Sequence, residues 1–391
     1  MKKIAVLGGG PAGAFAAERL ARAGLDTVVF DEKLAWEKPC GGGLTYKAYQ
    51  QYPFLIENDV PKRVVKQTCL AAPPAGAVMM NLGRPIVIYS RFDLNRMLLN
   101  RAEAAGAQLE KTRVLEIVRS GERWRIKTQR GSLDADFCIV ATGARNPLRN
   151  VGTEWKPEDA AYALGYYIPT DQEHIDIQFL PNLEGYIWLF PRCGHLSAGI
   201  GGKGEPAKSL RARLERYLDE KGISYKHAQF YGHLLPSLAR SAWRRNRVAG
   251  EGWLAVGDSA GLVDPITGEG LYYAMRSGDL ATQVVLDEAH SLIEKAAVYR
   301  DLLWREFAAD LAYGSSLATR VFRGQFLRGS VPARMVSFVR RSRQFRAVVE
   351  DLMAGTQPYL SLKSRLLDNL KPTLGEVALN SFLARLLPGR T

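Results

Sequence analysis

A glycine-rich segment near the start of the chain has the spacing that binds the diphosphate of a dinucleotide. Gly8, Gly10 and Gly13 form the pattern G-x-G-x-x-G between an apolar run at 4–7 and a helical pattern. These glycines permit a tight turn and a close approach of backbone to pyrophosphate, and the helix N-terminus presents free N–H groups. Asp31 closes the next apolar run, where a carboxylate can accept ribose hydroxyls. The order of apolar run, glycines, helical pattern, apolar run and acid predicts a dinucleotide site. The alternative is a glycine-rich turn in an unrelated α/β domain, in which the position of Asp31 would be a coincidence.

A second segment predicts contacts with the other half of such a cofactor. Gly257 and Asp258 follow the apolar run 253–256, and the Asp258 carboxylate can bond a polyol chain. Gly268 and Gly270 leave bare N–H groups at the start of a helix. The partial positive charge there stabilises an anionic ring system, of which a reduced flavin is one. The alternative is one more turn of an α/β domain.

Two further patterns indicate what surrounds the ring. Cys40 is followed by glycines 41–43, whose backbone can lie flat against a planar ligand. Its thiol is either a proton donor or redox-sensitive group at the flavin, or a small buried hydrophobe. Tyr186 and Trp188 share one face of a predicted strand, either as an apolar substrate wall with a hydrogen-bond donor or as a core aromatic pair. His233 is interpreted as structural.

The composition is that of a globular protein. The 391 residues, of which 47% are apolar and 24% charged, predict two or three domains and exclude wholesale disorder. The first apolar run is too short for a signal peptide, and no stretch reaches the roughly 18–20 apolar residues that cross a bilayer. The four cysteines form no C-x-x-C pair, so neither a disulfide framework nor a metal site is predicted, and a reducing cytoplasm is expected.

The net charge of +13 is concentrated in one segment. Between Asp310 and Glu350 the sequence has no acidic residue but has eight arginines interleaved with phenylalanines. The residues are Arg320, Arg323, Arg328, Arg334, Arg340, Arg341, Arg343 and Arg346, with Phe322, Phe326, Phe338 and Phe345. Such a segment suits an anionic membrane surface, and we expect peripheral membrane contact rather than nucleic acid. The alternative is a solvated helix face that pairs with acidic parts of the chain.

The elements that position these residues form an α/β domain, interrupted by a β-rich insertion and followed by a helical tail. Helices are predicted at 91–106 and 206–221, and from about Ala281 the whole chain is predicted to be helical. A short apolar run at 78–80 is predicted to end at Asn81. The other predicted strands are 27–30, 85–89, 109–118, 124–128, 132–137, 138–143, 161–168, 175–179, 186–190 and 196–200.

The two glycine motifs together, with P-x-T-G-E-G at 265–270, resemble the flavoprotein group that includes para-hydroxybenzoate hydroxylase. Within that group, P-C-G-G-G-L at 39–44 and Y-x-W-x-F-P at 186–191 resemble the geranylgeranyl reductase family. The resemblance covers about residues 1–290. It implies a discontinuous Rossmann-like FAD-binding domain of the glutathione reductase type, an inserted antiparallel β-sheet substrate domain and a C-terminal helical region. The expected boundaries are 1–63, 88–155 and 246–290 for the first domain, 64–87 and 156–245 for the second, and 291–391 for the third.

The resemblance implies extended FAD, with its adenosine near the first glycine motif and its isoalloxazine between 40–44 and 265–271. Arg91 is expected near the ribityl and pyrophosphate. The implied cofactor-binding residues are Gly8, Gly10, Ala12, Gly13, Asp31, Glu32, Cys40, Gly42, Gly43, Leu44, Arg91, Val114, Thr142, Gly143, Gly257, Asp258, Pro265, Gly268, Gly270 and Leu271. The implied residues of the reaction itself are Cys40, Tyr186 and Trp188.

The implied reaction is hydride transfer from reduced flavin to isolated C=C bonds of a geranylgeranyl or other isoprenoid chain. Thr142 stands where hydroxylases of the wider group have an aspartate that helps to bind the pyridine nucleotide. The electron donor, NADPH or a ferredoxin-like protein, therefore stays open. Two alternatives also stay open: an FAD monooxygenase or halogenase, since 185–191 is close to the halogenase pattern, and a membrane-held flavin protein that senses without turnover.

Overall fold

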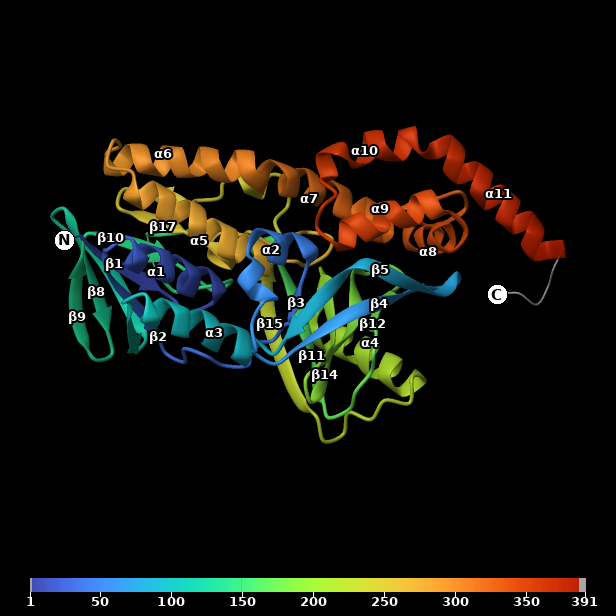
Figure 1. Cartoon of the computed structure of the whole chain (residues 1–391), viewed down its shortest axis with the longest axis horizontal. Helices are drawn as coiled ribbons and strands as arrows, with labels where there is room; N and C mark the ends of the chain where they lie inside the picture. Colours follow the sequence, from blue (N-terminus) through green and yellow to red (C-terminus); the bar gives the residue numbers. More distant parts are fainter. Residues whose placement is uncertain (1, 149, 387–391) are drawn as a thin grey trace.

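The computed structural model describes residues 2–148 and 150–386. Its helices and strands form three parts that follow one another from left to right in Figure 1. The first holds the glycine motifs, the second is a large mixed sheet, and the third is a group of C-terminal helices. The α/β fold with an inserted β-rich part and C-terminal helices is the one that the sequence predicted.

A six-stranded sheet forms the centre of the first part. Its order is β16-β17-β10-β1-β2-β6, and all pairs are parallel except β16 with β17. Its strands are β1 (Lys3–Leu7), β2 (Asp26–Asp31), β6 (Gln108–Lys111), β10 (Phe137–Val140), β16 (Ala249–Gly250) and β17 (Trp253–Ala255). The near-continuous burial of β1, β2 and β10 is what a parallel sheet covered on both faces requires.

Helices α1 (Pro11–Arg22), α3 (Arg91–Ala104) and α5 (Leu271–Leu286) pack against one another over this sheet. A three-stranded antiparallel sheet, β7 (Val114–Ser120), β8 (Arg123–Thr128) and β9 (Gly131–Ala135), contributes Ile117, Trp124 and Ile126 to the same core. The single strand predicted at 109–118 is therefore two strands in two sheets, separated at Thr112 and Arg113.

The second part is an eight-stranded sheet of order β15-β11-β14-β13-β12-β4-β5-β3. Its strands are β3 (Gly43–Leu44), β4 (Lys62–Ala72), β5 (Gly76–Tyr89), β11 (Ala160–Ile168), β12 (Ile175–Phe179), β13 (Glu184–Arg192), β14 (His195–Lys203) and β15 (Gln229–Pro236). Helix α4 (Ala207–Glu220) covers one end through Leu210, Leu214 and Leu218. The predicted stop at Asn81 is wrong: β5 continues through it, and the Asn81 side chain accepts a hydrogen bond from Gln67 on β4 at 2.9 Å.

The first helix of the C-terminal part packs against α5, and its later helices cover the β4–β5 end of the large sheet (Figure 1). It comprises α6 (Leu292–Leu303), a π-helical turn (Trp304–Ala308), α7 (Ala309–Arg323), α8 (Val331–Arg341), α9 (Arg343–Met353), α10 (Tyr359–Asp368) and α11 (Leu370–Leu386). The prediction of continuous helix is wrong between α7 and α8, where β18 (Gln325–Phe326) and β19 (Gly329–Ser330) form a hairpin. Leu327 and Arg328 turn this hairpin with positive φ, a conformation that local helical periodicity does not reveal.

The remaining short elements are helix α2 (Tyr46–Gln51) and four 3-10 turns, Pro53–Leu55, Pro157–Asp159, Ala242–Arg244 and Gly257–Ala260. Among the helices of the described residues, none combines the length and the apolar character that a bilayer crossing requires.

Candidate active site

A cleft of about 620 Å³ opens beside the carboxyl ends of the parallel strands β1 and β10, where ligands bind in open α/β sheets. Residues from several segments that are far apart in the sequence line it. They are Gly10, Pro11, Ala12, Lys38, Pro39, Cys40, Arg91, Ala141, Gly143, His233, Leu235, Val256, Asp258, Val263, Gly268, Gly270, Leu271 and Ala274.

The first glycine motif forms one wall of the cleft. A Cβ atom at Gly8, where φ is +119°, would lie 2.2 Å from the carbonyl oxygen of Ala141, and one at Gly13 would lie 1.9 Å from the carbonyl oxygen of Gly8. A Cβ at Gly10 would meet nothing within 4 Å, so this backbone is open to a ligand. Asp31 accepts the Gly9 amide at 2.7 Å and thereby fixes the loop.

The opposite wall is the loop before α5. The Asp264 carboxylate accepts hydrogen bonds from the amides of Ile266 and Thr267 at 2.9 and 2.8 Å and from the Tyr359 hydroxyl at 2.7 Å. These bonds shape the loop from within, with Gly268 at φ +71°. The α5 helix then begins after Gly270, and the Glu269 carboxylate accepts the amide of Tyr272 in its first turn at 2.9 Å.

An ion pair joins two further lining residues of the cleft, Lys38 and Asp258. Lys38 Nζ lies 3.1 Å from Asp258 Oδ2. Burial alone would raise the pKa of Asp258, but the Lys38 ammonium and His233 hold it below its ordinary value. Burial, together with the Lys38 charge, lowers the pKa of His233 to about 4, so its imidazole is neutral near pH 7. Within the described residues His233 Nε2 has no hydrogen-bond partner.

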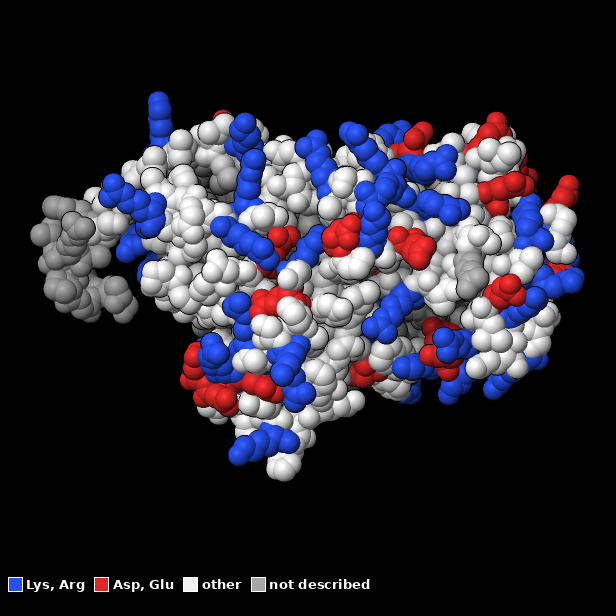
Figure 2. Space-filling model, turned by 180° about the vertical axis from the view of Figure 1, so that it is seen from behind, with Lys and Arg blue, Asp and Glu red and all other residues white. Residues whose placement is uncertain are grey.

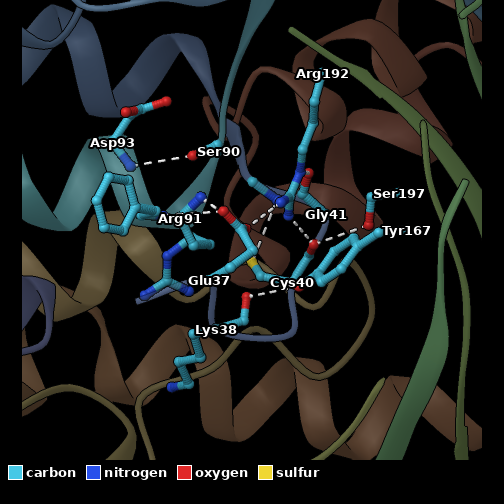
Figure 3. Close-up of polar contacts among 12 residues, drawn as sticks. Glu37, Lys38, Cys40, Gly41, Ser90, Arg91, Asp93, Tyr167, Arg192 and Ser197 are labelled. Atoms are coloured by element: carbon cyan, nitrogen blue, oxygen red, sulfur yellow. Dashed lines mark hydrogen bonds and ion pairs between the residues drawn. The ribbon is translucent and has the colours of Figure 1, made fainter. Parts of the chain in front are cut away.

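The loop that carries Cys40 is held by a fully buried arginine on β13 (Figure 3). The Arg192 guanidinium donates hydrogen bonds to the Glu37 carboxylate, to the carbonyl of Cys40 and, at 3.2 Å, to the carbonyl of Gly41. The Ser197 hydroxyl adds a second donor to the Cys40 carbonyl at 3.1 Å. The backbone on both sides of the thiol is therefore anchored to the large sheet.

Glu37 extends this network to the start of α3 (Figure 3). Its carboxylate accepts the amides of Arg91 and Phe92 at 2.9 and 3.2 Å, as an acid at a helix N-terminus does. Burial opposes its charge, but Arg192 and these two amides hold the pKa of Glu37 below its ordinary value. One carboxylate thus connects the cysteine loop, β13 and the helix that carries Arg91.

Tyr186 and Trp188 stand on one face of β13, with ring centroids 6.2 Å apart. The Tyr186 hydroxyl donates to the carbonyl of Thr267 in the loop before α5. The same strand reaches the cysteine loop, because Cβ atoms at Gly41 and Gly43 would lie 3.2 and 3.0 Å from the Phe190 ring. Strand β13 therefore contacts the loops on both sides of the cleft.

Of the residues singled out in the sequence, nine line the cleft: Gly10, Ala12, Cys40, Arg91, Gly143, Asp258, Gly268, Gly270 and Leu271. The others support it or lie further out. Leu44 is fully buried in the main core, and Val114 is half-buried at the start of β7. Glu32 is 3.9 Å from Arg113, and the Thr142 hydroxyl donates to Asn146 Oδ1 at 3.1 Å.

Three residues of the cleft and its network escaped the sequence interpretation: Glu37, Lys38 and Arg192. His233, which the sequence analysis interpreted as structural rather than catalytic, lines the cleft. A signal for Arg192 existed, because it directly follows the Y-x-W-x-F-P pattern on the same strand. Glu37 and Lys38 precede the cysteine by three and two residues, but nothing local shows which partner each one meets.

The cleft fits a flavin dinucleotide. The N-terminus of α1, which has no side-chain cap, lines the cleft and suits a diphosphate. Arg91 is 3% exposed, and within the described residues its Nε has no hydrogen-bond partner, as expected of a donor that awaits a ligand.

Comparisons with known proteins agree with this geometry. A family model described as pyridine nucleotide-disulphide oxidoreductase matches residues 2–172. A digeranylgeranylglycerophospholipid reductase of Methanothrix thermoacetophila is 30% identical over 319 residues, which are 74% of this chain and 78% of the relative. The crystal structure of a geranylgeranyl bacteriochlorophyll reductase-like protein from Thermoplasma acidophilum superposes with a TM-score of 0.77 at 22% identity, covering 94% of this chain and 98% of that one.

A flavin-dependent brominase, Bmp2, shares the fold with a TM-score of 0.68 at 16% identity, over 95% of this chain and 99% of that one. The fold is shared by several kinds of flavin-dependent enzyme, so the sequence relatives define the family more narrowly than the fold does. The family model and the flavin-dependent structural neighbours identify the cofactor as FAD. The chain belongs to the geranylgeranyl reductase family of FAD-dependent oxidoreductases.

Proposed function

We propose that this chain reduces isolated C=C bonds of a geranylgeranyl or other isoprenoid chain. The observation that carries the proposal is the position of β13, which contacts the cysteine loop through Phe190 and the loop before α5 through Tyr186. A substrate that lies on this strand face is thereby presented to the cleft between the two loops. The digeranylgeranylglycerophospholipid reductase, at 30% identity, supports an isoprenoid as the substrate class.

FAD, when bound, supplies the hydride. The residues that we propose to hold it are those of the first glycine motif and Asp31 for the adenosine half, Arg91 and Asp258 for the diphosphate and ribityl, and 40–44 with 265–271 for the ring. Their backbone amides and charges bind and orient the cofactor, while the apolar wall excludes water.

An isolated alkene is unactivated, so a proton must arrive with the hydride. Cys40 lines the cleft, and we propose its thiol as the donor. Burial raises the pKa of Tyr186, which keeps its hydroxyl protonated. Because that hydroxyl already donates to Thr267, we propose Tyr186 and Trp188 as the wall that positions the double bond. The reaction also needs an external reductant, which we propose to be NADPH or a ferredoxin-like protein.

The basic segment supports a membrane surface as a further partner. Within the described part of the chain none of its eight arginines forms an ion pair with an acidic side chain. Lys and Arg side chains are numerous over the upper half of the rear face, with acidic side chains among them and a further acidic cluster at the lower left (Figure 2). Phe326 and Leu327 at the hairpin tip are 46% and 56% exposed. We propose that this surface contacts anionic lipid, from which an isoprenoid substrate is drawn.

An anaerobic single-turnover experiment tests the function. The holoenzyme is reduced with dithionite, geranylgeranyl diphosphate or a geranylgeranylated lipid is added, and flavin absorbance and product mass are followed. Reoxidation with a gain of two mass units per double bond is the expected result. Reoxidation only after air is admitted, with an oxygenated or halogenated product, would identify a monooxygenase or halogenase instead. Tight lipid binding without any turnover would identify a sensor.

A further inference from the structure

A second pocket, of about 400 Å³, lies between the large sheet and the C-terminal helices, outside the FAD cleft. Four segments meet there: the end of β4, the end of β12 with its following loop, the end of α7, and the β18–β19 hairpin with the start of α8. The lining residues are Ala72, Pro73, Phe179, Leu180, Pro181, Asn182, Phe322, Arg323, Gln325, Ser330 and Pro332. Part of its wall is apolar, and its polar side chains come from the hairpin, the end of α7 and Asn182 in the loop after β12.

A row of aromatic rings connects this pocket with the active site. Phe322 and Phe179, which both line the pocket, have ring centroids 6.2 Å apart. The Phe179 ring lies 6.3 Å from that of Tyr186, because the two residues are direct partners across β12 and β13. Tyr186 then reaches the loop before α5 through its hydroxyl. Phe179 and Tyr186 therefore connect the pocket with the loop before α5, whose Gly268 lines the FAD cleft.

The outer rim carries positive charge. Arg323 lines the pocket and is exposed, and its one hydrogen bond within the described residues is a long contact of 3.4 Å with the Lys203 carbonyl. Arg320, Arg328 and Arg334 belong to the same segment, which has no acidic residue. A partly apolar wall with a basic rim is complementary to a molecule that has a long hydrocarbon chain and an anionic head.

We infer that this pocket is the entrance for the substrate, where Arg323 binds the phosphate-bearing head of an isoprenoid while the chain extends along Phe322, Phe179 and Tyr186 toward the flavin. The inference rests on the proposed function and adds the site of the head group. The phosphate belongs either to a free prenyl diphosphate or to the head group of a phospholipid. A guanidinium suits both, because its planar set of donors matches phosphate oxygens.

The test measures equilibrium binding of geranylgeranyl diphosphate and of uncharged geranylgeraniol to the oxidised holoenzyme. Arg323→Gln is expected to raise the Kd for the diphosphate about tenfold and to leave that for geranylgeraniol unchanged, because only the diphosphate loses a charge-assisted hydrogen bond. Arg300→Gln, the same change on the exposed face of α6, is the control and should alter neither Kd. Equal effects of both variants, or equal effects on both ligands, would overturn the inference.

A second variant fills the entrance without removing a charge. Gln325→Trp, at an exposed lining residue, is expected to weaken binding of both ligands and to leave FAD absorbance unchanged. Gln129→Trp in the distant turn between β8 and β9 is its control. Unaltered binding by Gln325→Trp would also contradict the assignment.

The source of the phosphate is separated by repeating the Arg323→Gln measurement with vesicles that contain a digeranylgeranylglycerophospholipid. Weaker binding of the Arg323→Gln variant to the free diphosphate or to the vesicles supports the entrance and identifies which molecule carries the phosphate. Unchanged binding to both refutes the entrance. Binding is measured without turnover, so a wild-type protein that binds these ligands at Arg323 yet reduces none of them would refute the proposed function and leave the pocket assignment standing.

Discussion

The buried guanidinium of Arg192 donates a hydrogen bond to the carbonyl of Cys40 and so ties the cysteine loop to the strand that carries Tyr186 and Trp188. Hydrogen bonds therefore join the wall on which we place the substrate to the loop on which we place the proton donor. The buried positive charge of Arg192 is tolerated because the guanidinium donates hydrogen bonds to the Glu37 carboxylate, which also neutralises it, and to the carbonyl oxygens of Cys40 and Gly41.

Arg192→Gln is expected to lower the free energy of unfolding by about 3 kcal/mol. This value is at the low end of the range for a broken buried ion pair, because the Glu37 side chain is partly exposed to solvent. It should also release FAD faster, which denaturant titration and flavin fluorescence measure. Arg192→Gln combined with Glu37→Gln should recover part of the stability, because no charge is then left unpaired. Wild-type stability of the single variant would contradict the anchoring role.

Cys40→Ser is expected to lower the rate of flavin reoxidation by an isoprenoid about 10²-fold, because a hydroxyl is a much weaker acid than a thiol. The absorbance spectrum of bound FAD should stay close to that of the wild type, since the serine occupies the same place. Stopped-flow spectrophotometry under anaerobic conditions measures the rate. Cys193→Ser, at an exposed cysteine, is the matched control and should react normally. A normal rate in Cys40→Ser would remove the thiol from the reaction.

His233 predicts a pH dependence of stability. Its pKa of about 4 in the folded protein lies below the ordinary value of 6.5, because burial and Lys38 disfavour the imidazolium. Below pH 6.5 the unfolded chain binds a proton that the folded protein does not, so stability is full above pH 6.5 and falls as pH decreases toward 4. The total change is about 3 kcal/mol. His233→Gln should flatten this part of the curve, which urea titrations between pH 4.5 and 7.5 would show. An unchanged slope in the variant would contradict the assignment.

Tyr359→Phe is expected to lower stability by about 1–2 kcal/mol and to weaken FAD binding, since Asp264, a buried acid, loses one of its donors. The loop before α5 depends on Asp264 for its shape. Thermal unfolding with and without added FAD measures both effects. Tyr313→Phe on α7, a hydroxyl for which the described residues provide no hydrogen-bond partner, is the control. Equal behaviour of the two variants would show that the Tyr359 hydroxyl has no such role.

The sequence predicted the dinucleotide fold because its signals are local: a strand, three glycines, a helix and an acid within 28 residues. The network around Arg192 was not predictable in this way. Arg192 and Glu37 are 155 residues apart, and only the pairing of the two sheets brings them together. The course of β5 through Asn81 was missed for a similar reason, because the partner of its amide, Gln67, is on another strand. The β18–β19 hairpin was missed because its turn depends on positive φ at non-glycine residues.

The order of strands in the six-stranded sheet affects how the protein matures during synthesis. Strand β10 pairs with β1 on one side and with β17 on the other, and β17 is followed directly by Asp258 and the helix that begins at Leu271. A nascent chain of about 250 residues therefore has its phosphate loop and its eight-stranded sheet but lacks one wall of the FAD cleft. We therefore expect the FAD cleft to be complete only after residues 253–286 have been synthesised.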